Sequence, residues 1–535
     1  MKPNFLLKKA VFLNFFSWEF WIPLLLLILL LAKNPFSDRS LIPNFEPYPD
    51  TFHYLVPPRC FLETGKWLLC RPNAAGITPD VPPLYSIIQI PFLLIYNDPR
   101  MFYFANVTLA IGSFFLLFKL LVKLKVDKLI IFSALLLTSV SYHFSWYPTL
   151  AMAENLIVFV FLLSLYVLLI ARNGYTIVIG LALAVCFYAT KYAFAPLTAT
   201  FYLLHTLKIW KYRESLPRWL PSLILTLSIV ALVVLLRTIT TSSLFSANYF
   251  SMQPLAEEVA QKTWFSLAFL PKHAFKYLQA LFGVPILVLW DIRPFFPPIL
   301  SWLGVLGLAL GLFKGRYRLV SAAILLGIVS QIAFISSFYA FDGRYIYPVV
   351  LALVIGFSIF LQIILSFQRH HRLFWCLFSL VFFIYLVSQT SRLKTLLAIN
   401  FKYAESPWYY LATKKIDAVI QDKNDSNPVV ITALPVFLFD FFASEDYQLL
   451  PLAPEQEAEK KSKLYGTNYN FDDLPKLYQQ ELNQGKSLYI SNYGLGNNAY
   501  MHEAYARVST NFKLTLISEG CYGACNVYAV HLQNK

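Results

Sequence analysis

Long apolar runs separated by short polar connections dominate the first 392 residues of the chain. A helix that crosses a bilayer needs about 20 apolar residues, and runs of this kind recur throughout the region. The stretch 175–209 is too long for one helix and carries Lys191 at its centre, which predicts a tight hairpin with the lysine at the turn. The pattern predicts eleven membrane spans, at residues 17–33, 101–122, 128–146, 150–171, 175–190, 192–209, 219–238, 295–313, 319–339, 345–367 and 373–391.

Two further apolar stretches, 82–96 and 277–290, are short for a span. Counting either one as a span would reverse every later connection. Both are rich in aromatic and proline residues, which favour the border between lipid and water. We interpret them as helices lying at the outer membrane interface.

Basic residues fall in alternate connections, and this asymmetry sets the predicted orientation. Cytoplasmic loops of membrane proteins carry the excess of Lys and Arg. The other connections mix both signs, so we place the N-terminus in the cytoplasm and the C-terminal part outside. The first apolar run has no convincing small-residue cleavage site after it, which favours an uncleaved span over a signal peptide. The basic group comprises Lys2, Lys8, Lys9, Lys119, Lys123, Lys125, Lys128, Arg172, Lys208, Lys211, Arg213, Arg218, Lys314, Arg316, Arg318, Arg369 and Arg372.

Composition agrees with a polytopic membrane protein. Of the 535 residues, 58% are hydrophobic and only 14% are charged, more apolar surface than a soluble core of this length needs. The net charge of +15 raises the question of nucleic-acid binding. The tail from residue 393 onward is slightly acidic, however, so the excess belongs to the membrane part and reflects orientation. Nucleic acid is therefore excluded as a partner.

The tail, residues 393–535, has a different composition and predicts a small α/β domain. A helix begins near "SPWYYLATKK", a short buried strand follows in "NPVVITALP", and a further helix and strand meet at a glycine. "KLTLISEGCYGACNVYAVHL" predicts two strands around a tight turn. We therefore divide the chain into a transmembrane domain, 1–392, with outer loops at 34–100 and 239–294, and an extracytoplasmic domain, 393–535.

The cysteines support this compartment. Cys60, Cys70, Cys521 and Cys525 all fall on the predicted outside, where disulfides persist. Compartment and spacing predict the pairs Cys60–Cys70 and Cys521–Cys525, with four unrelated thiols as the alternative. A zinc site at Cys521 and Cys525 would need two more ligands, and His502 alone does not supply them. No cofactor is predicted; a divalent metal remains possible but is not supported by the sequence.

Charged residues inside a bilayer are costly and mark functional sites. Those of this chain map to the outer ends of their helices, whereas a transporter more often places them near the midplane. A cluster at one face suits a reaction between a membrane-embedded donor and a molecule reached from outside. The residues concerned are Glu154, Lys191, Arg237 and Arg344, with Asp50, Glu63 and Asp342 at the same face.

Several motifs, in this order and on this topology, resemble the GT-C glycosyltransferases, in particular the branch of protein O-mannosyltransferases and aminoarabinose transferases. The resemblance covers roughly residues 15 to 390. Thr51 follows Asp50 where many members have a glutamate, so no metal or second-carboxylate role is carried over. The motifs are "PDTFHYLVPPRCFLETG", "PPLYSIIQIPF", "AENLIVFVF", "FYATKYAFAP" and "DGRYIYPVV".

The resemblance implies transfer of a sugar from a polyprenyl-phosphate donor, without a nucleotide, to an envelope lipid, glycan or protein. The leaving phosphate gains negative charge, and Lys191 and Arg344 could converge on it. Asp50 is the candidate base that takes the acceptor's proton, with Glu154 as the next candidate. Direct displacement would invert the anomeric configuration. Further substrate-binding candidates are His53, Tyr54 and Tyr345.

Structural alternatives remain for these residues. Asp50 could cap the helix that begins with "TFHYL". Glu154 could be present only because a carboxylate at a helix start interacts favourably with the helix dipole. Lys191 could extend to the interface from its turn, and Arg344 could pair with Asp342. For the whole chain the alternatives are a flippase or a non-enzymatic binder of lipid-linked glycans, and a membrane-anchored receptor.

Overall fold

The chain divides into two compact units in the computed structural model. The first comprises residues 1–33, 80–88 and 103–402, and the second 34–79, 89–102 and 403–535. The sequence-based boundary at residues 392 and 393 stays a prediction. The structure describes residues 17–32, 35–36, 49–67, 81–141, 144–145, 147–211, 266–282, 298–338, 341, 343–367, 408–432, 439, 443–445, 447–452, 472–492 and 499–533, with short pieces between 379 and 394.

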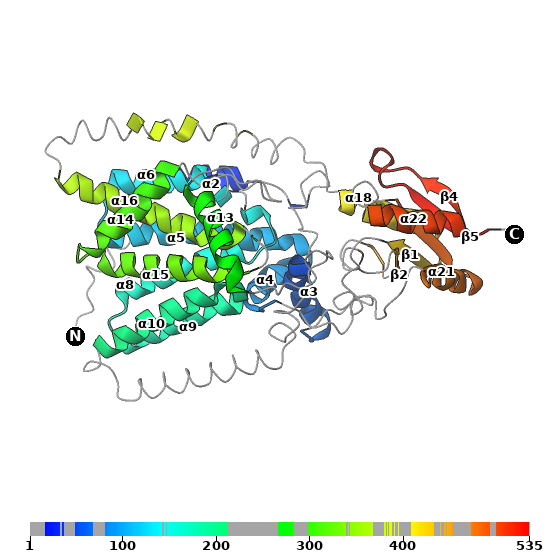
Figure 1. The fold of residues 1–535 in the computed structure, drawn as a ribbon, viewed down its shortest axis with the longest axis horizontal. Coiled ribbons are helices and arrows are strands. Elements are labelled where there is room, and N and C mark those ends of the chain that lie inside the picture. Colours follow the sequence, from blue (N-terminus) through cyan, green and yellow to red (C-terminus); the bar gives the residue numbers. More distant parts are fainter. Residues whose placement is uncertain are drawn as a thin grey trace. The chain divides into compact units, whose positions relative to one another are not determined.

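The first unit is a bundle of apolar helices (Figure 1). Nine of the eleven expected spans correspond to described helices. The span expected at 219–238 lies outside the described residues, and 373–391 is described only in pieces. The nine are α2 (Trp18–Leu31), α5 (Phe102–Lys123), α6 (Lys128–Val140), α8 (Glu154–Ile170), α9 (Gly174–Thr190), α10 (Ala195–Lys211), α14 (Pro298–Leu312), α15 (Arg318–Ile335) and α16 (Tyr347–Phe367).

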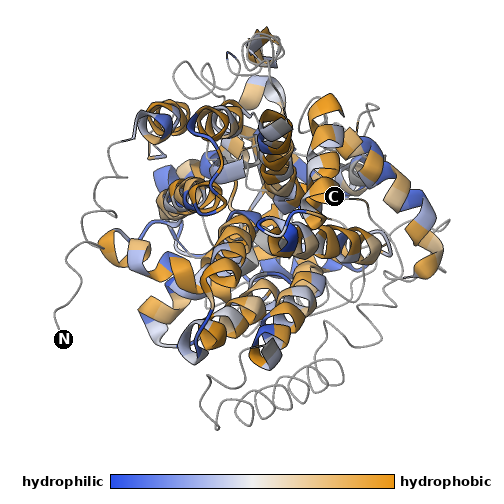
Figure 2. Cartoon of the chain, turned by 90° about the vertical axis from the view of Figure 1, so that its left-hand side faces the viewer, coloured by the Kyte–Doolittle hydropathy of each residue, from blue (hydrophilic) through white to orange (hydrophobic). Residues whose placement is uncertain are grey.

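The outward faces of this bundle are apolar, as a lipid-exposed surface requires. Hydrophobic residues, drawn in orange, predominate on the helices in Figure 2. Among the described residues, three stretches are long and apolar enough to cross a membrane by themselves, and shorter apolar helices accompany them. The three are Pro99–Lys123, Arg318–Ile335 and Gly343–Ser366. Large exposed side chains such as Leu25 and Val329 lie on the surface of the bundle. The fold class predicted from the sequence, an α-helical polytopic membrane protein, is confirmed.

Polar residues define where the helices begin and end. Asp127 accepts the Leu129 backbone N–H at 2.9 Å and caps the start of α6. Asn173 and Thr176 form a capping box at the start of α9. At the C-terminal end of α8, the Lys208 ammonium donates to the carbonyl oxygens of Leu168 and Ala171. The last carbonyl groups of a helix have no partner within the helix, so this lysine satisfies them.

The helices α14 and α16 approach each other closely because glycines lie between them. A Cβ atom at Gly304 would come within 2.7 Å of the Leu353 carbonyl oxygen. One at Gly307 would collide with the Gly356 carbonyl oxygen and with the Phe360 backbone. Small residues therefore allow main chain to contact main chain, a packing mode that helices in lipid favour.

The two short apolar stretches are helical where they are described. Residues 82–96 contain α4 (Leu84–Ile95). The first part of 277–290 belongs to α13 (Leu270–Phe282), which buries His273 and Tyr277 and exposes Phe275 on another face. Residues 283–290 lie outside the described part of the chain. The amphipathic character of α13 is typical of a helix at an interface, and the interfacial placement of both stretches stays a prediction.

The C-terminal part of the second unit is the predicted α/β fold. A five-stranded sheet has the order β2-β1-β3-β5-β4, in which β1 pairs in parallel with β2 and β3, and β5 pairs antiparallel with β3 and β4. The sequence pattern did not predict β2 or α22. The strands are β1 (Pro428–Thr432), β2 (Gln448–Pro451), β3 (Ser487–Ser491), β4 (Phe512–Ser518) and β5 (Val527–Leu532), with helices α18 (Trp408–Lys423), α21 (Leu474–Asn483) and α22 (Ala499–Asn511).

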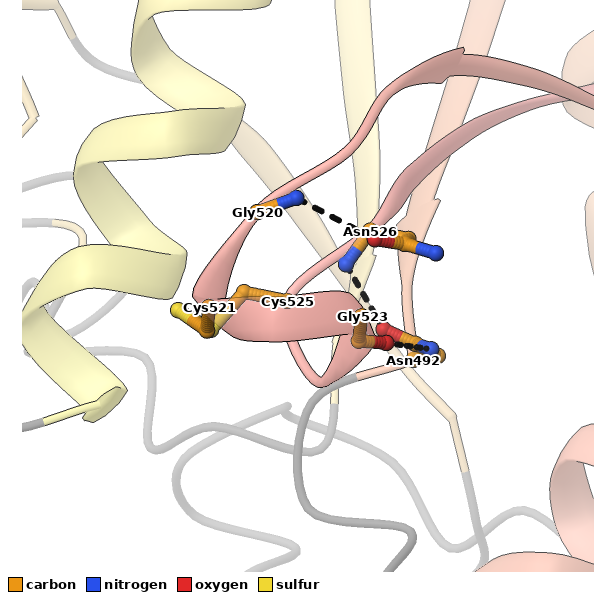
Figure 3. The surroundings of a disulfide bond; sticks show 6 residues. All are labelled: Asn492, Gly520, Cys521, Gly523, Cys525 and Asn526. Atoms are coloured by element: carbon orange, nitrogen blue, oxygen red, sulfur yellow. Dashed lines mark hydrogen bonds between the residues drawn. A yellow bond between two sulfur atoms is a disulfide. The ribbon is translucent and has the colours of Figure 1, made fainter.

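A disulfide closes the turn between β4 and β5 (Figure 3). Cys521 and Cys525 are joined with their Cα atoms 5.1 Å apart. Asn526 accepts the Gly520 N–H, and its own N–H donates to the Asn492 side chain, so the turn is also tied to the end of β3. The turn is thereby held by a covalent bond and by hydrogen bonds to the sheet.

Candidate active site

Glu154 is the first residue of α8 and is completely buried. The preceding residue, Ala153, provides no side-chain cap, so the helix start relies on other groups. A carboxylate in the first turn interacts favourably with the positive end of the helix dipole. This placement agrees with the helix start expected from the sequence, but burial makes the charge costly unless a cation accompanies it.

Lys191 provides that cation. It lies at the junction between α9 and the short 3-10 helix η5 (Tyr192–Phe194), in an extended conformation with φ −160° and ψ 128°. The hairpin turn predicted at this lysine is therefore present. Its side chain is buried, and Nζ lies 2.7 Å from Glu154 Oε1. Because the ammonium donates to a buried carboxylate, the alternative in which Lys191 extends to the interface is wrong.

Both side chains of the pair are shielded from solvent, and this burial determines how much the pair contributes to stability. Only 9% of the Lys191 side chain and none of the Glu154 side chain is exposed. Burying two charges costs several kcal/mol per ion, and their attraction roughly offsets this, so such a pair adds little net stability. Removing one partner is different, because the remaining charge stays buried without compensation. Ionisable residues inside a membrane helical bundle are rare, which makes the pair a functional-site candidate.

Tyr345 belongs to the same cluster. It lies in the 3-10 helix η9 (Gly343–Ile346), directly before α16, and Lys191 Nζ is 5.1 Å from the centre of its ring. Phe194 and Phe338 pack around Tyr345 at ring-centre distances of 6.2 and 6.4 Å. A cation over a ring face is stabilised by the ring quadrupole. The structure thus brings together Glu154, Lys191 and Tyr345 from three separate segments.

Arg344 is the residue before Tyr345 and is half-buried. Its position in η9 makes it a neighbour in sequence of the residue that contacts Lys191. Asp342, its expected alternative partner, lies outside the described residues. The role of Arg344 as a phosphate ligand stays a prediction.

Asp50, His53 and Tyr54 lie on α3 (Pro49–Thr64), in the second unit. α3 begins at Pro49, so Asp50 lies in its first turn, and the choice between cap and base stays a prediction. The structure describes the backbone of Asp50 and His53 but not their side chains. Tyr54 is buried. The measured geometry of the candidate site therefore concerns Glu154, Lys191 and Tyr345.

The expected outer cysteines differ in how far they are described. Cys60, on α3, is buried and disulfide-bonded. Its expected partner, Cys70, lies outside the described residues, so the pairing Cys60–Cys70 stays a prediction. Within the part of the chain that the structure describes, no three His, Cys, Asp or Glu side chains gather as metal ligands would.

Two buried amides near the site were not among the candidates predicted from the sequence: Asn106 on α5 and Asn155 on α8. Asn155 follows Glu154, and its Nδ2 donates to the Tyr147 carbonyl oxygen at 3.0 Å. Each is the one amide in an otherwise apolar helical segment. Such an amide has to be hydrogen-bonded inside the bundle, so this pattern in the sequence could have indicated both residues.

An apolar helical bundle with a buried ion pair at the helix ends, together with an α/β unit, defines a polytopic membrane protein with an additional small domain. Two solved structures of ArnT from Cupriavidus metallidurans share this fold over 95% of the chain and 96% of their own length. The structure bound to undecaprenyl phosphate is 13% identical with a TM-score of 0.57, and the apo structure is 12% identical with a TM-score of 0.56. The fold is therefore GT-C-like, as the resemblance in the sequence implied. No protein-family profile and no curated protein matches the chain.

Proposed function

We propose that this protein is a membrane glycosyltransferase that moves a sugar from a polyprenyl-phosphate donor to a cell-envelope acceptor. The observation that carries the proposal is the buried Lys191 ammonium, held by Glu154 beside Tyr345 in a GT-C-like bundle. A similar structure of the same fold is bound to undecaprenyl phosphate. A fixed, desolvated cation is what a lipid phosphate needs as it becomes the leaving group.

In the proposed reaction the bond between the anomeric carbon and the phosphate oxygen breaks while the acceptor's oxygen or nitrogen attacks the same carbon. Asp50 takes the proton that the acceptor loses, and the lipid phosphate departs as the anion. Lys191, with Arg344, stabilises the charge on that phosphate. Attack opposite the leaving group inverts the anomeric configuration. His53, Tyr54 and Tyr345 contact the substrates, and Glu154 holds Lys191 in place.

The proposed location is the cell membrane, with the reaction at its outer face. The predicted orientation places the ends of α9 and α16 that carry Lys191 and Tyr345 outside, together with the α/β domain. The acceptor is an envelope lipid, glycan or protein that reaches this face.

Binding of undecaprenyl phosphate to the purified protein in nanodiscs tests the proposal. We expect Lys191→Ala to weaken binding by at least tenfold, because a charge-assisted contact to the phosphate is lost. Lys128→Ala is the control: Lys128 also lies near a buried carboxylate, Glu19, at 3.9 Å, but its side chain is 75% exposed and lies outside the candidate site. Equal affinities of wild type and Lys191→Ala would overturn the assignment. Incubation with labelled polyprenyl-phosphate sugars would then identify the sugar transferred.

A further inference from the structure

Asn106 connects three segments around the start of α8. It is completely buried on α5. Its Oδ1 accepts the Tyr85 hydroxyl at 2.8 Å, and its Nδ2 donates to the carbonyl oxygens of Leu150, at 2.6 Å, and Pro148, at 3.2 Å. One side chain thus links α4, α5 and the irregular segment 147–153 that leads into Glu154.

Tyr85 orients Asn106 from the side of α4. It is completely buried near the start of that helix. Its hydroxyl donates to Asn106 Oδ1 at 2.8 Å and so fixes the orientation of the amide whose Nδ2 reaches the segment before Glu154. From the other side, Asn155 Nδ2 donates to the carbonyl oxygens of Tyr147 and Met152. The residues immediately before Glu154 are therefore held from both sides.

These contacts satisfy buried backbone groups, which any irregular segment inside a bundle requires. The asparagine side chains alone, however, pair these backbone carbonyl groups, and this pairing does not require a residue from α4. The contacts run from Tyr85 through Asn106 to the carbonyl oxygens of Pro148 and Leu150. The same segment leads into Glu154, which holds Lys191 at 2.7 Å. A shift of the segment would therefore move the ammonium that we assign to the donor phosphate.

We propose that Tyr85 and Asn106 are positioning residues, which set the place of Glu154 and, through it, of Lys191. They act through the backbone of Pro148 and Leu150 and do not themselves touch the phosphate. This inference rests on the proposed donor site at Lys191. It gives α4, within the apolar stretch 82–96, a role in arranging that site.

A double-mutant cycle tests the inference, because residues that act through a common partner are not additive. Undecaprenyl phosphate is the probe, and its Kd is measured in nanodiscs for wild type, Tyr85→Phe, Lys191→Ala and the double variant. Tyr85→Phe keeps the ring and removes only the hydroxyl. We expect it to weaken binding about three- to tenfold in the presence of Lys191, and not at all when residue 191 is alanine.

Tyr103→Phe is the matched control. Tyr103 is also buried, and its hydroxyl donates to the Leu31 carbonyl oxygen on α2 instead of to Asn106. We expect this variant to leave the Kd unchanged in both backgrounds, although its thermal unfolding midpoint falls. A merely structural role of Tyr85 would give the same pattern as Tyr103. Asn106→Leu, which removes all three hydrogen bonds at similar size, provides a second variant if Tyr85→Phe does not fold.

The outcomes separate the two proposals. If Lys191→Ala weakens binding but Tyr85→Phe leaves the Kd unchanged, or weakens it equally in both backgrounds, the positioning role is wrong and the donor site stands. If wild type does not bind undecaprenyl phosphate, or Lys191→Ala binds it as wild type does, the donor site is wrong and the positioning role falls with it.

Discussion

Lys191 Nζ and Glu154 Oε1 lie 2.7 Å apart inside the helical bundle, although the two residues are 37 positions apart in the sequence. Each was a candidate site residue on its own, one as a phosphate ligand and the other as a base. Their contact makes Glu154 first of all the residue that keeps Lys191 in place. Because Glu154 Oε1 already accepts the Lys191 ammonium, we keep Asp50 as the proposed base.

Breaking this pair should destabilise the protein. We expect Glu154→Gln to lower the free energy of unfolding by about 3–5 kcal/mol, because the buried Lys191 charge loses its partner. Thermal unfolding of the purified protein measures the effect. Glu503→Gln is the control, since Glu503 pairs with Arg507 at 3.0 Å on an exposed helix surface, where pairs contribute little. Equal, small effects of both changes would contradict the buried-pair interpretation.

Asp50→Asn should reduce sugar transfer by roughly 10²–10⁴-fold, because an amide cannot take the acceptor's proton. Transfer is measured with labelled polyprenyl-phosphate sugars, on protein shown to insert normally. Loss of a favourable first-turn charge on α3 would lower stability by only about 0.3–1 kcal/mol. Transfer close to that of wild type would move the catalytic assignment to Glu154.

Cysteine labelling tests the predicted orientation. A cysteine introduced at Arg316, in the connection between α14 and α15, should be shielded from an impermeant thiol reagent in intact cells. One introduced at the exposed Glu503, in the α/β domain, should react. The reverse pattern at either position would contradict the orientation predicted from the alternating basic loops.

The close approach of α14 and α16 should make Gly307 sensitive to a single methyl group. Gly307→Ala would place a Cβ against the Gly356 carbonyl oxygen, so we expect the free energy of unfolding to fall by about 1–3 kcal/mol. Gly315→Ala is the control, because a Cβ there meets no atom within 4 Å. Unfolding in detergent compares the two. Tolerance of alanine at both positions would mean that the helices can separate without loss.

Removal of the Cys521–Cys525 disulfide should loosen the end of the sheet. The loop that it closes is short, and the chain-entropy relation gives about 2 kcal/mol. We expect the double change Cys521→Ala with Cys525→Ala to speed hydrogen exchange of the β4 and β5 amides in the intact protein. Exchange in α2 is the internal reference and should stay unchanged. Unaltered exchange in both strands would show that the hydrogen bonds of Asn492 and Asn526 suffice.

Much of the architecture follows from the sequence alone. Runs of apolar residues predicted nine of the helices that the structure describes, and Lys191 marked the turn between α9 and α10. Gly485 follows α21 with φ +79°, at the position where a glycine was expected to end the helix. Such features depend on residues that are neighbours along the chain, so local patterns are enough to predict them.

The tertiary structure alone decided which of these elements meet. No local pattern pairs Glu154 with Lys191, places Tyr345 beside them, or sets Gly307 against Gly356, because each contact joins different helices. The short strand β2 was missed for the same reason: four residues become a strand only because β1 offers them a hydrogen-bonding edge. The sequence determined the spans and the candidate chemistry, and the packing of helices decided that the buried lysine has a carboxylate for its partner.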